Sequence, residues 1–299
     1  MLSQFTQHMT PAKAGFALLL GGAMWGLYWI PVRQMGEMGL PGTWAGLVLY
    51  LATLLLLSPA IWRKRQNLIE NWRLLVVSGA FTGAAFGLWT ISLFYTDVVR
   101  AILLFYLTPV WSTLIGVAIL GERLNIFRVL GLVFGLTGLV VVIGNGAEIP
   151  WPLNFGDWMA LCSGIAWSLG TTGLYRSEGV SVTGQMFGFL AGGLVVSLFA
   201  AALIGSDLPP SVASDQILPV AGFALLTAFY IVPMIWLTIW PATLLSPARV
   251  GLLLMSEVVV GIASAALLSG ETFGYREALG AVLIVGAAVL ELSGPEKSS

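Results

Sequence analysis

Charged residues are scarce in this sequence. Asp, Glu, Lys and Arg together make up 9% of its 299 residues, whereas an ordinary soluble domain has about 25%. Hydrophobic residues make up 58% of the chain, and the mean hydropathy is +0.93. Such a chain has too few polar groups to cover a water-facing surface, so a soluble globular protein is excluded.

Cysteine and histidine are almost absent. Cys162 and His8 are the single residues of their kinds, so a disulfide framework is excluded and the usual ligands of a zinc or iron–sulfur centre are lacking. The sequence also contains no P-loop and no His-Glu-x-x-His run, the motifs of ATP binding and of zinc peptidases. We therefore expect no cofactor, no metal ion, no enzymatic activity and no nucleic-acid partner.

Long apolar runs are what the sequence has in abundance. A helix needs roughly 20 apolar residues to cross a hydrocarbon core of ~30 Å, and ten runs have about this length. They cover residues 14–35, 43–62, 74–95, 98–120, 127–144, 155–175, 182–205, 217–240, 247–269 and 275–292. Short polar turns, such as 121–125 and 270–274, separate them. The sequence predicts an all-α, multi-pass membrane protein with ten transmembrane helices in a lipid bilayer.

Positive charge is distributed unevenly between the two sets of loops. With the N-terminus in the cytoplasm, ten Lys and Arg residues fall on the cytoplasmic side. They are Lys13, Arg63, Lys64, Arg65, Arg73, Arg123, Arg128, Arg176, Arg249 and Lys297. Arg33, Arg100 and Arg276 fall on the other side. Because cytoplasmic loops carry the excess of Lys and Arg, we expect both termini in the cytoplasm.

The sequence repeats itself with a long period. Six residues recur 149 positions later: Arg100, Leu103, Leu104, Gly121, Glu122 and Gly131 match Arg249, Leu252, Leu253, Gly270, Glu271 and Gly280. The first and sixth runs share a Gly-x-x-Trp pattern, ending at Trp25 and Trp167. We predict two five-helix repeats, 1–147 and 148–299, and an odd helix number makes them inverted. Inverted repeats place a binding site near the membrane midplane and allow a rocking motion, which favours a transporter.

These features also carry a family resemblance. The pattern of ten runs, the Trp-containing first run of each half, Leu107-Thr108-Pro109, the Gly-Glu pairs and Glu257 are similar to those of the drug/metabolite transporter superfamily, EamA-like ten-helix type. Within it, the chain most resembles the aromatic amino acid exporter branch. The resemblance implies a location in the bacterial inner membrane and export of aromatic amino acids and other amino acids.

Glu257 leads the candidate site residues. It lies well inside the ninth apolar run, where a carboxylate costs roughly 2.5–3.5 kcal/mol on insertion scales, so it should face the bundle interior or a wet cavity. There it can bind the ammonium group of a substrate or exchange a proton. The alternative is a protonated Glu that only bonds to a neighbouring helix.

Two prolines are candidate hinges. Pro109 and Pro233 lie within the fourth and eighth runs, where each removes a backbone donor and frees the carbonyl four residues earlier, those of Phe105 and Phe229. A freed carbonyl can accept a hydrogen bond from an ammonium group or water, and the kink can bend during transport. The alternative is an ordinary tolerated kink.

Aromatic residues deep in the runs are the remaining candidates for substrate binding, because their rings can stack on an apolar or aromatic solute. They are Tyr106, Trp167, Trp25, Trp111, Trp89 and Tyr230, and Trp236 also lies deep in its run. The alternative for each is ordinary packing. Trp residues near the ends of runs, Trp62, Trp72 and Trp240 among them, are typical of the membrane interface.

Glycine recurs every four residues in the third run, at Gly79, Gly83 and Gly87, and in the seventh, at Gly184, Gly188 and Gly192. Such stripes let helix backbones pack closely, and they can also serve as sliding surfaces. Gly131-x-x-x-Gly135 can pack within one chain or between two, so the oligomeric state stays open. Glu122 and Glu271 each follow a Gly at a helix end and are expected to be turn or capping groups.

The favoured function is a secondary transporter for small amino acid-like solutes that works by alternating access. Proton coupling through Glu257 is one hypothesis for its energy source. A multidrug or other metabolite efflux carrier of the same fold is the first alternative. A passive channel is the second, and it is disfavoured because the sequence has no filter-like repeat and no rings of charge.

Overall fold

The computed structural model describes residues 11–40, 43–96, 101, 104–143, 152–177, 179–204, 212, 214–269 and 274–294. Every regular element within these ranges is a helix, and they contain no strand. The expectation of an all-α protein is therefore confirmed for this part of the chain. The predicted boundary between the repeats, at residue 147, lies outside the described residues, as do Arg100, Leu103, Gly270 and Glu271.

The helices follow the apolar runs closely. The first half contains α2 (Pro11–Leu27), α3 (Trp29–Glu37), α4 (Thr43–Arg63), α5 (Arg65–Glu70), α6 (Trp72–Tyr95), α8 (Thr108–Leu120) and α9 (Ile126–Ile143). The second half contains α10 (Phe155–Tyr175), α11 (Val182–Ile204), α12 (Ile217–Ala242), α13 (Pro247–Leu254), α14 (Ser256–Ser269) and α15 (Tyr275–Ser293). The length of the apolar runs is thus enough to place the helices. In lipid, the backbone N–H and C=O groups of each run must bond to one another, and a helix satisfies them within the run.

Six helical stretches in the described residues are long and apolar enough to cross a membrane. They are Ala12–Glu37, Trp44–Arg63, Trp72–Trp89, Val182–Ala202, Ile217–Ala242 and Pro247–Leu268. Thr108–Leu120, Ile126–Val141 and Ala278–Ser293 are shorter apolar helices. A multi-pass membrane protein agrees with these helices, while the count of ten crossings stays a prediction.

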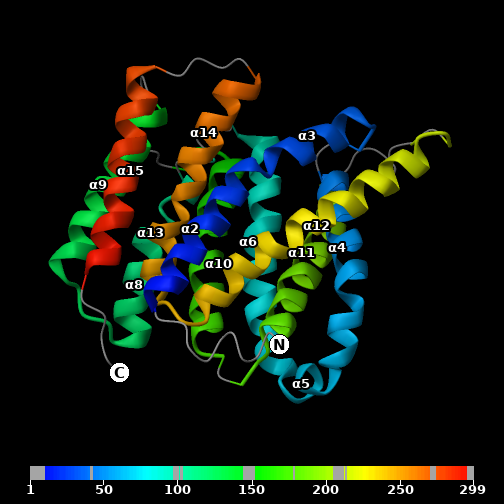
Figure 1. Cartoon of the computed structure of the whole chain (residues 1–299), viewed down its shortest axis with the longest axis horizontal. Coiled ribbons are helices and arrows are strands. Elements are labelled where there is room, and N and C mark those ends of the chain that lie inside the picture. Colours follow the sequence, from blue (N-terminus) through cyan, green and yellow to red (C-terminus); the bar gives the residue numbers. More distant parts are fainter. Residues whose placement is uncertain are drawn as a thin grey trace.

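The helices form one bundle in which successive long helices run in opposite directions (Figure 1). α2 begins and α15 ends at the lower end of this view, where α5 also lies. The basic residues of α4 and α5, with Lys13 at the start of α2, belong to that same end. Charge is therefore concentrated at one end of the bundle, as the sequence predicts, although the direction of this end in a cell stays a prediction.

The two glycine stripes pack against each other. α6 lies against both α10 and α11, and a Cβ added at Gly83 would stand 2.3 Å from the carbonyl carbon of Gly192. A Cβ added at Gly79 would stand 2.5 Å from the carbonyl oxygen of Gly188. No side chain fits between these backbones, so the contact of α6 with α11 depends on glycine.

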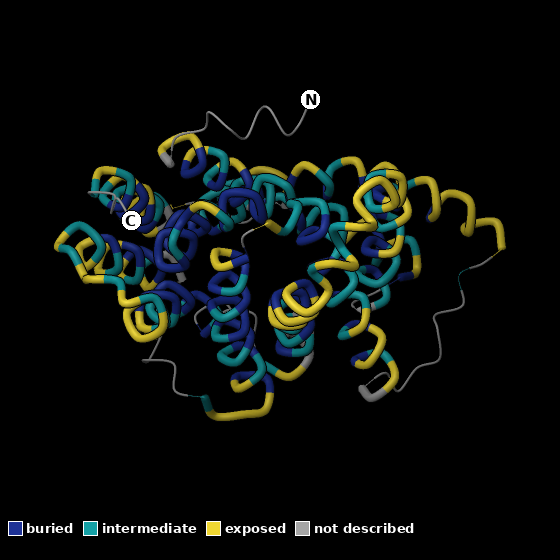
Figure 2. Tube along the Cα trace, turned by 90° about the horizontal axis from the view of Figure 1, so that it is seen from below, coloured by how far each residue is buried: buried dark blue, intermediate teal, exposed yellow. Residues whose placement is uncertain are grey.

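Burial separates an interior from an apolar outer surface. Figure 2 shows buried residues gathered toward the middle of the bundle and exposed ones on its outer turns and ends. Leu49, Leu190 and Ile235 belong to the buried core, whereas Phe199 and Leu226 are exposed. Large apolar side chains cover much of the outside, which suits contact with lipid rather than water.

Candidate functional site

Two interruptions of the helices define the centre of the candidate site. Leu104 and Phe105 are helical, Tyr106 and Leu107 form a turn, and α8 begins at Thr108. In the second half, α13 ends at Leu254, and Met255 separates it from α14. Tyr106 and Met255 are 149 residues apart in the sequence, the same spacing as that of the repeated residues. The two breaks therefore fall at equivalent positions of the predicted repeats.

Thr108 and Pro109 explain the first break. Pro109 occupies the first turn of α8, where a missing N–H is tolerated, rather than the middle of a continuous helix. The hydroxyl of Thr108 donates a hydrogen bond of 2.5 Å to the carbonyl of Phe105. The carbonyl that the sequence analysis expected to be free for a ligand thus already has a partner. A Cβ added at Gly251 of α13 would stand 3.1 Å from the Cα of Pro109, so the two broken helices meet there.

Glu257 lies just beyond the second break, in the first turn of α14. Its side chain is intermediate in exposure.

Tyr106 is the side chain that meets Glu257. The two side chains interact, but their geometry does not satisfy that of a hydrogen bond. The Tyr106 hydroxyl is left without a hydrogen-bond partner among the residues that the structure describes, although Tyr106 is only 6% exposed. A buried hydroxyl without a partner costs roughly 1–3 kcal/mol, so this pair is short of one polar group that a ligand can supply.

Apolar walls surround the pair. Tyr106 packs in a cluster with Leu139 of α9, Leu252 of α13, Val258 of α14 and Ile284 of α15. Charge interactions are stronger in such surroundings than in water. A cationic group that reaches Glu257 would therefore be bound with little competition from solvent.

The aromatic candidates fall into two connected groups. In the first, Trp89 and Phe105 have ring centroids 4.9 Å apart, and Phe105 and Tyr106 have centroids 5.2 Å apart. Trp89 therefore reaches the pair through Phe105. Trp111 lies on α8, and its buried indole N–H has no partner within the described residues.

The second group lies between α2, α4, α6, α10 and α11. The Trp25 ring is 5.4 Å from Tyr28 and 6.4 Å from Phe189, and Phe189 is 6.3 Å from Trp167. Phe105 packs against this cluster as well as against the cluster of Tyr106. The two groups are therefore continuous through Phe105.

Two of the candidates have polar ends that hold helices together. The indole N–H of Trp25 donates to the hydroxyl of Thr238 at 3.0 Å, and the Tyr230 hydroxyl donates to the carbonyl of Met24. Both contacts join α2 to α12.

Pro233, the second candidate hinge, lies inside α12, and the helix continues through it. Pro233 is exposed on the outside of the bundle.

Sequence reasoning missed Tyr28 and Tyr50. Both are buried, and their hydroxyls have no hydrogen-bond partner in the described part of the chain. Tyr50 packs edge-on against Phe86 with centroids 5.1 Å apart. A tyrosine inside an apolar run gives no signal of its own, because only the fold shows that its hydroxyl is buried without a partner.

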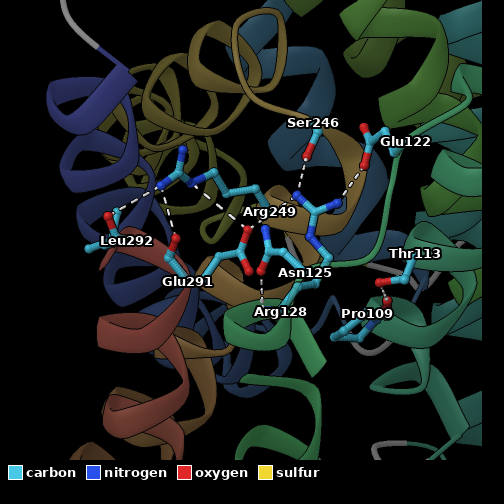
Figure 3. A network of polar contacts seen from close by, with 9 residues as sticks. All are labelled: Pro109, Thr113, Glu122, Asn125, Arg128, Ser246, Arg249, Glu291 and Leu292. Atoms are coloured by element: carbon cyan, nitrogen blue, oxygen red, sulfur yellow. Dashed lines mark hydrogen bonds and ion pairs between the residues drawn. The ribbon is translucent and has the colours of Figure 1, made fainter. Parts of the chain in front are cut away.

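Sequence reasoning also missed a network of buried charges at the end of the bundle where α15 ends (Figure 3). Arg128 of α9 forms an ion pair of 2.6 Å with Glu122 and one of 3.4 Å with Glu291 of α15, and it donates to the Ser246 hydroxyl at 3.2 Å. Arg249 of α13 lies 4.0 Å from Glu291 and donates to its main-chain carbonyl at 2.9 Å. The Glu122 carboxylate is thus an ion-pair partner rather than only a turn group.

This network ties segments of both predicted halves together. Its charged side chains are at most 14% exposed, and removing one partner of a buried pair costs about 3–5 kcal/mol because the other charge is left uncompensated. The end of the bundle that carries most of the basic residues is therefore firmly held together.

Within the described ranges, no cluster of His, Cys, Asp and Glu is suited to hold a metal ion.

Comparison with known proteins finds similarity to transporters. Residues 12–144 match the model of the EamA-like transporter family. YvbV of Bacillus subtilis (strain 168), an uncharacterized transporter, is 31% identical over 165 residues, 53% of each chain. YoaV, another uncharacterized transporter of this organism, is 25% identical over 150 residues, 49% of this chain and 51% of the relative. The chain thus spans about half the length of the curated relatives that it matches.

The fold itself also has a match among solved structures. A crystal structure of a protein covers 94% of this chain and 95% of its own, with a TM-score of 0.71 at 21% identity. Such a likeness shows a shared fold and says nothing about function. The family and the two relatives are transporters, not enzymes. The first part of this chain is thus similar to the EamA-like transporter family, and the apolar helices agree with a multi-pass membrane protein.

Proposed function

We propose that this protein is a secondary transporter of the bacterial inner membrane that moves small amino acid-like solutes by alternating access. Export of aromatic amino acids is the substrate assignment that we favour. The observation that carries the proposal is the meeting of Tyr106 and Glu257 at two equivalent helix breaks. Broken helices at corresponding positions of two halves are the best pointer to a transporter binding site.

The architecture of the proposal is ten transmembrane helices in two inverted repeats, 1–147 and 148–299, with both termini in the cytoplasm. The match to the transporter family ends at residue 144, close to the proposed boundary. The equal spacing of the two breaks supports the repeat. The grouping of basic residues at the end where α2 begins and α15 ends supports the orientation.

Glu257 binds the ammonium group of the substrate in this proposal, and Tyr106 donates its hydroxyl to an acceptor of the same substrate. The adjoining rings of Phe105 and Trp89 supply faces for stacking, worth about 0.5–1.5 kcal/mol per ring pair. Tyr28 and Tyr50 extend the aromatic lining, together with Trp25 and Trp167. This combination of one carboxylate with many rings fits an aromatic amino acid better than a sugar or an anion.

Alternating access requires the two ends of the bundle to open in turn. The network of Arg128, Glu122, Arg249 and Glu291 closes the cytoplasmic end and must loosen for the site to face the cytoplasm. The glycine contact of α6 with α11 provides a smooth surface for such a movement. Proton coupling follows if Glu257 releases its proton when the substrate binds and regains it when the substrate leaves.

Counterflow in liposomes tests the proposal. Purified protein is reconstituted with an excess of unlabelled Phe inside and labelled Phe, Trp, Met, Thr, Lys or Glu outside. Saturable, transient accumulation of Phe and Trp is the expected result. Uptake that neither saturates nor shows counterflow would indicate a channel, and no signal with any amino acid would overturn the substrate class, after which cationic drugs and other metabolites become the panel.

A further inference from the structure

An apolar groove runs along the outside of the bundle between α2 and α12, away from Glu257. Its volume is about 480 Å³, and its lining comes from Ala12, Lys13, Phe16, Ala17 and Leu20 on α2 and from Trp236, Leu237 and Trp240 on α12. Apart from Lys13, every lining side chain is apolar or aromatic. The groove therefore offers no set of polar groups that would hold an amino acid.

The walls of the groove are fixed by contacts between the two helices. Trp236 and Trp240 stack with ring centroids 5.0 Å apart and an angle of 12° between their planes. A Cβ added at Gly21 of α2 would stand 3.0 Å from the backbone of Leu237, so the helix backbones touch beside the groove. The hydrogen bond from Trp25 to Thr238 holds the same pair of helices. The groove is thus a preformed feature and needs no rearrangement to accept a ligand.

The groove is apolar along its length and basic at its mouth. Lys13 lies at the start of α2, and Leu20 lies about 10 Å further along the helix at 1.5 Å per residue. The side chains of Phe16 and Leu20 are 62% and 46% exposed. At hydrocarbon depth such exposed side chains face lipid rather than water. Lys13 is exposed and makes no ion pair or hydrogen bond in the described part of the chain. The mouth therefore carries an uncompensated positive charge near the membrane interface.

We propose that this groove is a binding site for an anionic phospholipid, with an acyl chain between α2 and α12 and the head-group phosphate paired with Lys13. A groove at hydrocarbon depth is filled by lipid tails, because neither water nor a polar solute is stable there. Lys13 selects the head group, since one Lys near a membrane surface favours anionic lipid by about 1 kcal/mol, or about fivefold. The proposal requires a bilayer but does not depend on the transported substrate.

Quenching of tryptophan fluorescence by brominated acyl chains tests this site in the full-length protein. Dibrominated phosphatidylglycerol or dibrominated phosphatidylcholine is titrated into the protein in mixed micelles. The part of the quenching that is lost in Trp236→Phe reports on the groove. We expect phosphatidylglycerol to quench this part at about fivefold lower mole fraction than phosphatidylcholine. Lys13→Gln should abolish the difference and leave the quenching by phosphatidylcholine unchanged.

Lys64→Gln is the matched control, because Lys64 is an exposed cation at the same end of the bundle and does not line the groove. It should keep the preference for phosphatidylglycerol. Equal quenching by the two lipids in the wild type would mean ordinary annular lipid and would overturn the proposal. So would an equal effect of Lys64→Gln, which would indicate general surface charge. An absence of quenching at Trp236 would show that the groove is closed to lipid.

Discussion

The side chains of Tyr106 and Glu257 interact beside two helix breaks, at Tyr106 and Met255, which are 149 residues apart in the sequence. Each residue has a cost in the bundle that the other does not fully offset. Glu257 brings a charge into an apolar interior, and Tyr106 brings a hydroxyl that has no hydrogen-bond partner within the described residues. The pair is incomplete without a third polar group, and the proposed substrate supplies it.

Replacement of Glu257 by Gln removes the charge and keeps the size of the side chain. We expect KM for the amino acid substrate to rise about 10- to 150-fold, because a hydrogen bond to a charged group contributes about 1.5–3 kcal/mol. We also expect the transport rate to lose its dependence on pH, since Gln cannot exchange a proton. Initial counterflow rates over a series of substrate concentrations and pH values measure both effects.

Glu37→Gln is the control for this change, because Glu37 lies at an exposed end of α3 and only pairs with Arg33 at 3.7 Å. It should leave KM and the pH profile unchanged. An unaltered pH profile in Glu257→Gln would contradict proton coupling through this residue. In that case, facilitated transport without coupling describes the protein better.

Removal of the Tyr106 hydroxyl should lower substrate affinity without lowering the thermal stability of the protein. Tyr106→Phe deletes a buried hydroxyl that lacks a partner in the described structure, so we expect no loss of thermal stability. We expect substrate affinity to fall about two- to tenfold, because one neutral hydrogen bond contributes about 0.5–1.5 kcal/mol. Tyr230→Phe should lower thermal stability and leave substrate affinity unchanged, because the Tyr230 hydroxyl donates a hydrogen bond to the Met24 carbonyl. Thermal unfolding in detergent and substrate titration distinguish the two variants, and a stability loss in Tyr106→Phe would show that its hydroxyl is structural.

The buried ion-pair network should be essential for stability. Arg128→Ala leaves Glu122 without its ion-pair partner and Glu291 with only the longer contact of 4.0 Å to Arg249, and we expect it to lower the free energy of unfolding by about 3–5 kcal/mol. The pair of Arg33 and Glu37 is the comparison, because its side chains are 63% and 59% exposed. Arg33→Ala should cost less than about 1 kcal/mol. Chemical denaturation in detergent measures both, and equal effects of the two variants would contradict a special role for the network.

The helices were predictable from sequence because lipid requires an apolar stretch of fixed length. The breaks were only partly predictable. Pro109 signals the first, but the second falls at Met255, which is neither Pro nor Gly. α2 packs closely beside this break, where a Cβ at Gly22 would stand 2.2 Å from the Ser256 hydroxyl oxygen. Such a contact between helices distant in the sequence leaves no local pattern.

The candidate site was predictable as single residues but not as a constellation. Glu257 stands out because a carboxylate is unusual deep in an apolar run, and Tyr106 because it lies beside Pro109. Their meeting depends on how the two halves pack. Arg128 and Glu291 gave no signal, because charges near helix ends usually belong to the membrane interface, and only the structure shows that they are buried together.

The glycine contact between α6 and α11 gives the last test. A Cβ at Gly83 would stand 2.3 Å from the backbone of Gly192, and backbone atoms cannot yield as a flexible side chain does. We expect Gly83→Ala to destabilise the protein by about 1–3 kcal/mol through overpacking and to slow counterflow. Gly222→Ala in α12 is the control, since no described atom lies within 4 Å of its added Cβ, and we expect it to be neutral or stabilising by up to about 1 kcal/mol. Thermal unfolding and initial counterflow rates compare the two variants, and full activity and stability in Gly83→Ala would show that the helices separate easily at this contact.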